Sequence, residues 1–388
     1  MSNHIEQLNV MSSDISFYLH IPFCRRKCGY CSFVSYQGRE GNIPAYVDAL
    51  EKELALRVAG KRLRTIYFGG GTPSLLTPEQ VADILSTLHS LSDVDSGAET
   101  TMEANPGTVD RASLTAMRKL GINRLSIGVQ SLNDGELATL GRIHTAAEAR
   151  EAVRLARDAG FANVNIDLIY GAPGQALSQW RNTLNEVIKL NPEHLSLYPL
   201  TLEGDEPMSL AIERGELPAL DADLAAAQYE LAEELLAAQG YQHYEISNWA
   251  RVGHECQHNL VYWQGLPYIG VGVAAHSYID GHRFATTTDL DSYLDVFRSG
   301  VSLQPVLDEE IGPELELSEA VILGLRLGQG VNLDAIQSKF GIDLLSRYGR
   351  QVDQLLSSGL LECMDSHIRL TRRGRLLGNE VFWQFLPV

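Results

Sequence analysis

Three cysteines are the residues of this sequence that are best placed to do chemistry. Cys24, Cys28 and Cys31 follow one another with the spacing C-x3-C-x2-C. Three thiolates from one short loop can bind three irons of a 4Fe-4S cluster, whereas ligation of every iron takes four cysteines. The spacing therefore predicts a cluster with one iron open to an external chelator. The alternatives are three buried thiols and a zinc site that a histidine completes, although zinc sites usually include a second cysteine pair, which this sequence lacks.

The elements that position this loop are predicted from an alternation of short apolar segments with amphipathic stretches. One helix begins with Thr77 as the N-cap and Gln80 in position for a capping box. Gly121 and Gly160 are expected to end two others in the left-handed conformation. The strands are predicted at residues 17–21, 65–68, 100–103, 124–129, 163–169 and 195–200. The helices are predicted at residues 44–59, from 78 onwards, and at 108–120, 145–159 and 177–189.

This repeated order of strand and helix predicts an α/β fold with parallel strands, either a doubly wound sheet or a barrel. Both architectures place ligands at the carboxyl ends of the strands. Polar or glycine-rich residues recur at that position, and they are the segments Cys24 to Cys31 and Gly69 to Thr72, then Glu103, Gln130 and Asp167. We therefore expect these residues to form a single site at one end of the sheet.

The chain changes character after residue 240. Residues 241–288 are predicted as short strands and loops rich in His, Tyr and Trp, and the acidic segment 304–311 as a linker. Helices at 314–327, 334–339 and 343–357, strands at 360–363 and 368–370, and a helix from Thr371 are then typical of a small winged-helix-like α+β module. The predicted division is a main domain of residues 1–240, a barrel extension of residues 241–303 and a C-terminal domain of residues 304–388.

Composition excludes several classes of protein. The chain has 388 residues and a formal charge of −18, which disfavours a dedicated nucleic-acid binder and favours docking of the C-terminal module on the main domain. No run approaches the roughly 20 apolar residues that a membrane span needs. The first 16 residues lack the basic-then-apolar order of a signal peptide. A cytoplasmic protein is predicted, in which Cys256 and Cys363 are small buried hydrophobes.

Further motifs accompany the cysteines. YLHIPFC runs from Tyr18 to Cys24, and GGGTP begins at Gly69. The others are MEANPG at 102–107, GVQS at 128–131, GRIH at 141–144 and DLIYG at 167–171. Together they closely resemble the radical S-adenosylmethionine (SAM) superfamily, and within it the group of oxygen-independent coproporphyrinogen III dehydrogenases and their relatives, the radical SAM heme chaperones. The resemblance covers nearly the whole chain and implies a partial (β/α) TIM-like barrel with a SAM-binding 4Fe-4S cluster at its mouth.

The resemblance implies a role for each residue of the SAM site. Gly70, Gly71 and Thr72 would let the backbone approach the amino group of SAM, where a Cβ would block it. Arg142 would pair with the SAM carboxylate in fork geometry. Glu103 would accept a hydrogen bond from a ribose hydroxyl or an ammonium group. The other implied contacts are Tyr18, Tyr30, Gln130 and Asp167. Taken alone, such residues are also typical of a tight turn, of surface charges and of core aromatics.

Three departures distinguish the two branches of this group. Cys31 is followed by Ser32 and Phe33, so the extra cysteine of the dehydrogenase pattern is missing, and only 17 residues precede Tyr18. The segment HNLVYW, residues 258–263, matches the H-N-x-x-Y-W motif, which is associated with heme binding in the chaperone branch. The resemblance therefore implies that His258 ligates heme iron and that Asn259, Tyr262 and Trp263 contact the porphyrin. The alternatives are a packed turn and a metal site at His254, Cys256 and His258, which would need an extended strand.

The function predicted from the resemblance is that of a heme chaperone, which binds heme, a 4Fe-4S cluster and SAM and transfers heme to acceptor proteins. Acceptors of the respiratory chain are implied, and with them transient contact with membrane proteins and an electron donor for the cluster. The competing hypothesis is a radical SAM enzyme that acts on a porphyrinogen or a related substrate, such as a dehydrogenase or a C-methyltransferase. Coproporphyrinogen dehydrogenase activity is not expected.

Overall fold

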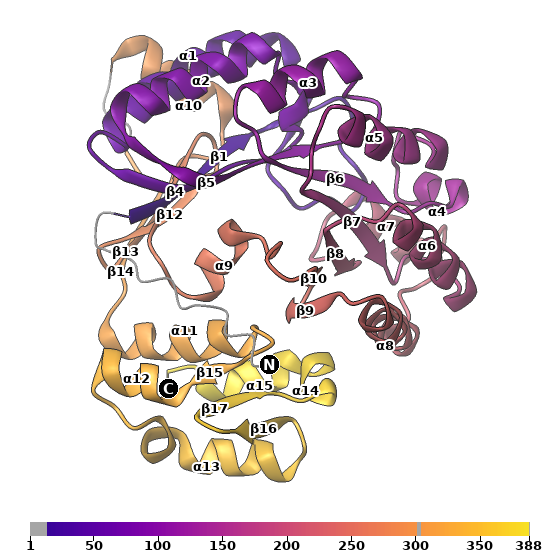
Figure 1. Cartoon of the computed structure of the whole chain (residues 1–388), viewed down its shortest axis with the longest axis vertical. Coiled ribbons are helices and arrows are strands. Elements are labelled where there is room, and N and C mark those ends of the chain that lie inside the picture. Colours follow the sequence, from indigo (N-terminus) through magenta and orange to yellow (C-terminus); the bar gives the residue numbers. More distant parts are fainter. Residues whose placement is uncertain (1–13, 301–303, 388) are drawn as a thin grey trace.

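The computed structural model describes residues 14–300 and 304–387, so the predictions about the first 13 residues lie outside it (Figure 1). Its centre is a sheet in which six strands pair in parallel and in chain order. These strands are β1 (Asp14–Ile21), β4 (Arg62–Gly70), β5 (Asp93–Ala104), β6 (Arg124–Gln130), β7 (Val164–Tyr170) and β8 (His194–Pro199). These strands coincide with the six predicted segments. The sheet curves into a partial barrel, as the resemblance implied.

Helices cover the convex face of this sheet (Figure 1). The capping box at Thr77 is present, and Gly121 and Gly160 have φ values of 105° and 88°, as predicted. The 17-residue helix α8 was not predicted. The helices of the barrel are α1 (Ile43–Arg57), α2 (Pro78–Leu91), α3 (Arg111–Lys119), α4 (Asp134–Thr139), α5 (Ala146–Asp158), α6 (Leu177–Lys189), α7 (Pro207–Glu213) and α8 (Ala222–Ala238).

The two faces of the parallel strands differ in polarity. On β6, Leu125, Ile127 and Val129 are fully buried in the apolar core beneath the helices, while the alternate residues Arg124 and Ser126 line a cavity on the concave side. Because side chains of a strand point alternately to opposite faces, each strand contributes one apolar row and one row to the interior of the barrel. The concave face is therefore the polar face of the sheet.

Antiparallel strands extend the sheet at both ends. Beyond β1 lie β11 (Tyr268–Val271), which pairs with it in parallel, then β12 (His276–Ile279), β13 (His282–Ala285) and β14 (Leu307–Glu310). Beyond β8 lie β10 (Asn248–Ala250) and β9 (Gln242–Glu245), and the small pair β2 (Phe23–Cys24) and β3 (Tyr36–Gln37) stands apart. The linker prediction was wrong for residues 307–310, because they pair with β13 as an edge strand.

The predicted barrel extension, residues 241–303, contains two helices, of which only α9 lies within the residues 241–288 that were predicted as short strands and loops. Helix α10 (Leu290–Ser299) packs against α1. Helix α9 (Gln257–Trp263) lies on the concave side of the sheet, between β4 and α11 of the C-terminal module (Figure 1). The HNLVYW segment is therefore helical and neither extended nor a simple turn.

The C-terminal module has a hydrophobic core of its own, centred on Val321, Val352 and Ile368. It is a small α+β unit, as predicted, with the sheet order β15-β17-β16. Its elements are α11 (Pro313–Leu325), β15 (Val331–Asn332), α12 (Leu333–Phe340), α13 (Leu344–Ser357), β16 (Leu361–Met364), β17 (His367–Leu370), α14 (Arg372–Leu376) and α15 (Gly378–Phe382). Across the described ranges, no helix is both long and apolar enough to cross a membrane.

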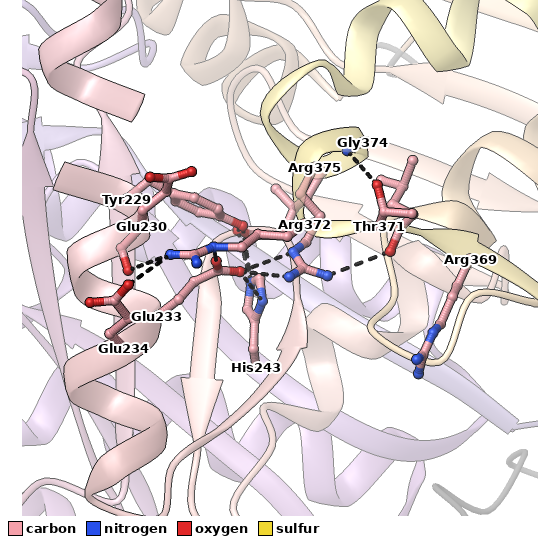
Figure 2. A network of polar contacts seen from close by, with 12 residues as sticks. Tyr229, Glu230, Glu233, Glu234, His243, Arg369, Thr371, Arg372, Gly374 and Arg375 are labelled. Carbon is pink, nitrogen blue, oxygen red and sulfur yellow. Dashed lines mark hydrogen bonds and ion pairs between the residues drawn. The ribbon is translucent and has the colours of Figure 1, made fainter. Parts of the chain in front are cut away.

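Ion pairs fasten this module to the barrel (Figure 2). Arg372 and Arg375 on α14 both donate to the carboxylate of Glu233 on α8, at 2.9 Å and 2.8 Å. His243 on β9 lies 3.5 Å from the same carboxylate. The Glu233 side chain is only 12% exposed, so its two arginine partners compensate for its burial.

Replacing Glu233 should therefore loosen the module. We expect Glu233→Gln to lower the free energy of unfolding by about 1–2 kcal/mol, because a partly buried charge pair loses its shared acceptor. Urea unfolding and limited proteolysis of the module would measure the change. Glu234→Gln is the matched control, since Glu234 is 67% exposed and its one ion pair among the described residues is with Arg372, at 3.3 Å. Equal effects of the two variants would contradict this role of Glu233.

Candidate functional site

A cavity of about 360 Å³ opens at the carboxyl ends of the parallel strands and extends into the barrel. This is where an α/β barrel holds its ligands, and the size is that of a small-molecule site. Most of the predicted site residues line it. They are Cys24, Cys28, Tyr30, Cys31, Gly70, Gly71, Thr72, Glu103, Gln130, Arg142, Asp167 and Asn259. Four predicted residues are not in its wall: Tyr18, His258, Tyr262 and Trp263.

The three clustered cysteines stand on one loop at the mouth of this cavity. Cys24 ends β2, and a turn closed by the Cys31 amide and the Cys28 carbonyl, at 3.1 Å, brings the other two together. All three thiols are partly exposed and unpaired. Burial, together with the neighbouring thiols Cys28 and Cys24, raises the pKa of the Cys31 thiol. A bound cluster would reverse that shift, because its irons stabilise the thiolate form.

The arrangement of the metal-ligating side chains bears on the alternative prediction of a zinc site. In residues 14–300 and 304–387, no three Cys, His, Asp or Glu side chains converge on one position for a metal ion. A single zinc ion requires such convergence. A 4Fe-4S cubane instead takes each thiolate on a different iron, so three separate thiols facing a cavity fit it.

The glycines after β4 are required by packing as well as by any ligand. Gly70 has a φ of 108°, and a Cβ there would lie 2.6 Å from the His20 ring. A Cβ on Gly71 would lie 2.7 Å from the carbonyl oxygen of Phe23. Both glycines nevertheless line the cavity. The tight turn therefore accounts for the residue type, and it also presents bare backbone to the site.

Two carboxyl groups lie in the wall of the cavity. Glu103 accepts hydrogen bonds from the Tyr67 hydroxyl at 2.9 Å and from the Gly70 amide at 3.1 Å. Burial and the nearby charge of Asp167 raise the pKa of Glu103 to about 7. Asp167 accepts from Ser126 at 3.0 Å and from another strand residue, Asn165, at 2.7 Å, and burial raises its pKa too. Both acids are therefore held in place by donors while facing a possible ligand.

The raised pKa of Glu103 predicts a pH effect on stability. Because the folded state binds this proton more tightly than the unfolded state, stability is lost as the pH rises from about 4.5 through about 7. Glu103→Gln cannot ionise, so it should escape this loss. We expect its free energy of unfolding, relative to wild type, to increase by on the order of 2 kcal/mol between pH 5 and pH 8. Urea unfolding of both proteins at the two pH values measures this, and a constant difference would contradict it.

Arg142 connects the cysteine loop to the end of β6. One Nη atom lies 3.5 Å from the Cys28 sulfur, and the other donates to the Gly128 carbonyl at 3.0 Å and to Asn105. Gln130, at the end of the same strand, has a φ of 63°, which is strained for a residue other than glycine. Strained backbone of this kind is typical of functional sites. Both residues are placed to contact a ligand bound beside the cysteines.

The two predicted tyrosines differ in position. Tyr30 lines the cavity between Cys28 and Cys31, and burial raises the pKa of its hydroxyl. Tyr18 lies one layer behind the wall, where its hydroxyl is 3.1 Å from His20 Nδ1 and its ring is stacked 6.1 Å from that of Tyr67. In this structure Tyr18 supports Tyr67 and does not face the cavity itself.

The side chains of the HNLVYW motif do not face one common surface. His258 is 1% exposed, with Nδ1 2.7 Å from the Thr65 hydroxyl and Nε2 2.9 Å from the Tyr262 hydroxyl. Burial, together with the charge of Arg124, lowers the pKa of His258 to about 3, so its imidazole is neutral. Asn259 faces the cavity, while Trp263 packs 4.7 Å from the guanidinium of Arg326 in the C-terminal module.

The alternative metal site at His254, Cys256 and His258 was wrong. Cys256 is the N-cap of α9, so the three residues do not alternate along a strand. The carboxylate of Glu99 caps the helix by accepting from the amides of Gln257 and His258, both at 3.1 Å. These contacts fix the start of α9 against β5.

Several cavity residues were missed by the sequence prediction. They are Tyr67, Asn105, Arg124, Ser126, Asn165, Ser196 and Tyr198. The alternation of residues within the strands was the sequence signal that could have identified them. Every second residue of β6 lines the cavity, namely Arg124, Ser126, Gly128 and Gln130. Asn165 and Asp167 repeat the pattern on β7. Polar residues at period two in a strand with an otherwise apolar face indicate a polar barrel interior.

Comparison with known proteins agrees with this architecture. A model of the radical SAM superfamily matches residues 18–187, and a model of the HemN C-terminal domain matches residues 311–377. The structure of coproporphyrinogen III oxidase (HemN) from Escherichia coli, described as a radical SAM enzyme, superposes with a TM-score of 0.84 at 25% identity and covers 96% of this chain and 90% of that one.

Curated relatives narrow the assignment. The heme chaperone HemW of Bacillus subtilis is 34% identical over 376 residues, which are 96% of this chain and 99% of that protein. The heme chaperone HemW of Escherichia coli is 42% identical over 282 residues, which are 70% of this chain and 73% of that protein. The chain therefore belongs to the HemW family of the radical SAM superfamily.

Proposed function

We propose that this protein is a heme chaperone, which binds heme and a SAM-binding 4Fe-4S cluster and transfers heme to acceptor proteins. The observation that carries the proposal is the combination of full-length similarity to HemW with a cysteine loop at the mouth of a polar cavity. All five cysteines are unpaired, which suits a reducing compartment such as the cytoplasm. Acceptors of the respiratory chain would require transient contact with membrane proteins.

The residues of the cavity fit the cluster and SAM. Cys24, Cys28 and Cys31 would bind three irons and leave the fourth for the amino and carboxylate groups of SAM. Arg142, 3.5 Å from Cys28, would pair with that carboxylate, and Glu103 would accept from a ribose hydroxyl. A reduced cluster of this kind supplies an electron to SAM, and an electron donor must therefore reach the exposed loop.

The residues of α9 would bind heme. A histidine that ligates iron must be neutral and have a free lone pair on one ring nitrogen, and the pKa of about 3 keeps His258 neutral. When Nδ1 donates its proton to Thr65, Nε2 carries the lone pair that the Tyr262 hydroxyl covers at 2.9 Å. Ligation by Nε2 would replace this hydrogen bond, so we propose that α9 shifts when heme binds. Asn259, Tyr262 and Trp263 would then contact the porphyrin.

A radical SAM enzyme acting on a porphyrinogen is the second candidate, and the likeness to HemN favours it. Incubation of the reconstituted protein with reductant, SAM and coproporphyrinogen III decides between the two. We expect no protoporphyrinogen, together with transfer of bound heme to an added apo-hemoprotein faster than its spontaneous release. Formation of protoporphyrinogen, or transfer no faster than release, would refute the chaperone proposal.

A further inference from the structure

Arg124 is a charged residue of the cavity whose guanidinium is unpartnered in the part of the chain that the structure describes. It is the first residue of β6, so its place is at the deep end of the barrel interior, and it is only 2% exposed while still lining the cavity. Its Nε atom is buried without a hydrogen-bond partner. Throughout the described residues, its guanidinium forms neither a hydrogen bond nor an ion pair with the protein. A buried charge in this state is costly unless something compensates for it.

Three carboxylates lie near Arg124, but each accepts its hydrogen bonds from other groups. Glu99 accepts from the amides of Gln257 and His258 at the start of α9. Glu103 is held by Tyr67 and Gly70, and Asp167 by Ser126 and Asn165, as described above. All three carboxylates are close enough to influence Arg124 electrostatically, yet none pairs with it.

A second donor in the same cavity is also unpartnered. The side-chain amide of Asn259, on α9, faces the cavity and forms no hydrogen bond with the described part of the chain. Tyr198, on β8, lines the same cavity. Two planar groups with free N–H donors therefore face the cavity from β6 and from α9, and an anionic ligand would satisfy both.

We propose that Arg124 and Asn259 form a subsite that binds a carboxylate group of the ligand at the deep end of the cavity. A guanidinium binds a carboxylate through two parallel N–H···O bonds. A monoanionic carboxylate suits the site better than a dianionic phosphate, because Arg124 supplies a single positive charge. The subsite is distinct from Arg142, which already contacts Cys28, Asn105 and Gly128 at the mouth.

This inference rests on the proposed function for its ligands, since both heme and SAM carry carboxylates. Heme has two propionates. SAM has one α-carboxylate, which the proposed function assigns to the open iron and Arg142, so a contact of SAM with Arg124 would overturn that assignment. The test must therefore separate the two sources. Hemin dimethyl ester carries neutral methyl esters in place of the two charged propionates, so a change in the ratio of the two affinities between wild type and an Arg124 variant reports a propionate contact.

The experiment titrates wild type, Arg124→Met, Arg124→Lys and Asn259→Ala with hemin, with its dimethyl ester in the same detergent buffer, and with SAM. For a propionate contact, wild type binds hemin at least tenfold more tightly than the ester, and Arg124→Met abolishes that preference. For a SAM contact, Arg124→Met instead weakens SAM binding at least tenfold. Arg124→Lys should retain part of either effect. Arg118→Met, on the outer helix α3, is the matched control and should change neither.

Stability distinguishes a ligand-binding arginine from a structural one. Because Arg124 has no partner, Arg124→Met leaves no carboxylate unpaired, and its melting temperature should equal or exceed that of wild type. Affinities for all three ligands that match wild type would overturn the subsite, and a lower melting temperature alongside them would assign Arg124 a structural role. If wild type binds no heme, the proposed function fails, and the SAM titration alone decides the subsite.

Discussion

Each of the variants Cys24→Ser, Cys28→Ser and Cys31→Ser abolishes the absorbance and the EPR signal of the reconstituted 4Fe-4S cluster, if the three thiols are its protein ligands. The expected effect is complete, because a variant with two thiolates anchors only half of the four irons. The loop supplies no substitute, since Ser32 and Phe33 follow the last cysteine. Anaerobic reconstitution of all three variants, with iron and sulfide analysis, measures the loss.

Two further cysteines provide the controls. Cys256 is fully buried at the start of α9, as predicted, whereas Cys363 is exposed on β16, so the prediction of a buried position was wrong for Cys363. Neither lines the cavity. Cys256→Ser and Cys363→Ser should therefore keep wild-type cluster content. A cluster that survives the loss of Cys28, or that requires Cys256, would contradict the assignment of the three ligands.

The second large effect is expected for His258→Ala, which should weaken the binding of heme. We expect at least a tenfold loss of heme affinity, about 1.4 kcal/mol, with a shifted Soret band, because the iron loses an imidazole ligand. Cluster content should not change, since His258 does not line the cavity that the cysteines face. Heme titration and cluster absorbance on the same preparations measure both. His258→Gln retains hydrogen-bonding capacity toward Thr65 and Tyr262, and it should lose heme equally.

Two matched variants sharpen this test. Tyr262→Phe removes the hydroxyl that covers Nε2, so it should bind heme at least as tightly as wild type. His282→Ala removes a histidine from the exposed strand β13 and should leave binding unchanged. Unaltered affinity and spectrum in His258→Ala would show that this histidine is not the iron ligand. The HNLVYW helix would then be a packing element, with Asn259 as its contact to the cavity.

The barrel and the mouth of the site were predictable from the sequence because local signals determine them. Alternating strands and helices, the capping box at Thr77 and the glycine helix ends all act over a few residues. Parallel strands then place their carboxyl ends together, which is why Cys24, Gly71, Glu103 and Asp167 meet in one cavity.

The remaining features depend on contacts between distant segments. Helix α9 is held by Glu99 of β5 and by Thr65 of β4, more than 150 residues away in the sequence. No local pattern shows that these contacts bury His258. The isolation of Arg124 is likewise a property of the folded cavity, because it follows from Glu103 and Asp167 being bound by other donors.

A single titration tests whether one chain holds a cluster and heme at the same time, each on protein ligands of its own. Heme is added stepwise to anaerobically reconstituted wild-type protein while the cluster and Soret absorbance are recorded together. We expect a Soret band that saturates at one equivalent of heme, with the cluster absorbance unchanged. A Soret band that never saturates, or cluster absorbance that falls as heme binds, would contradict it.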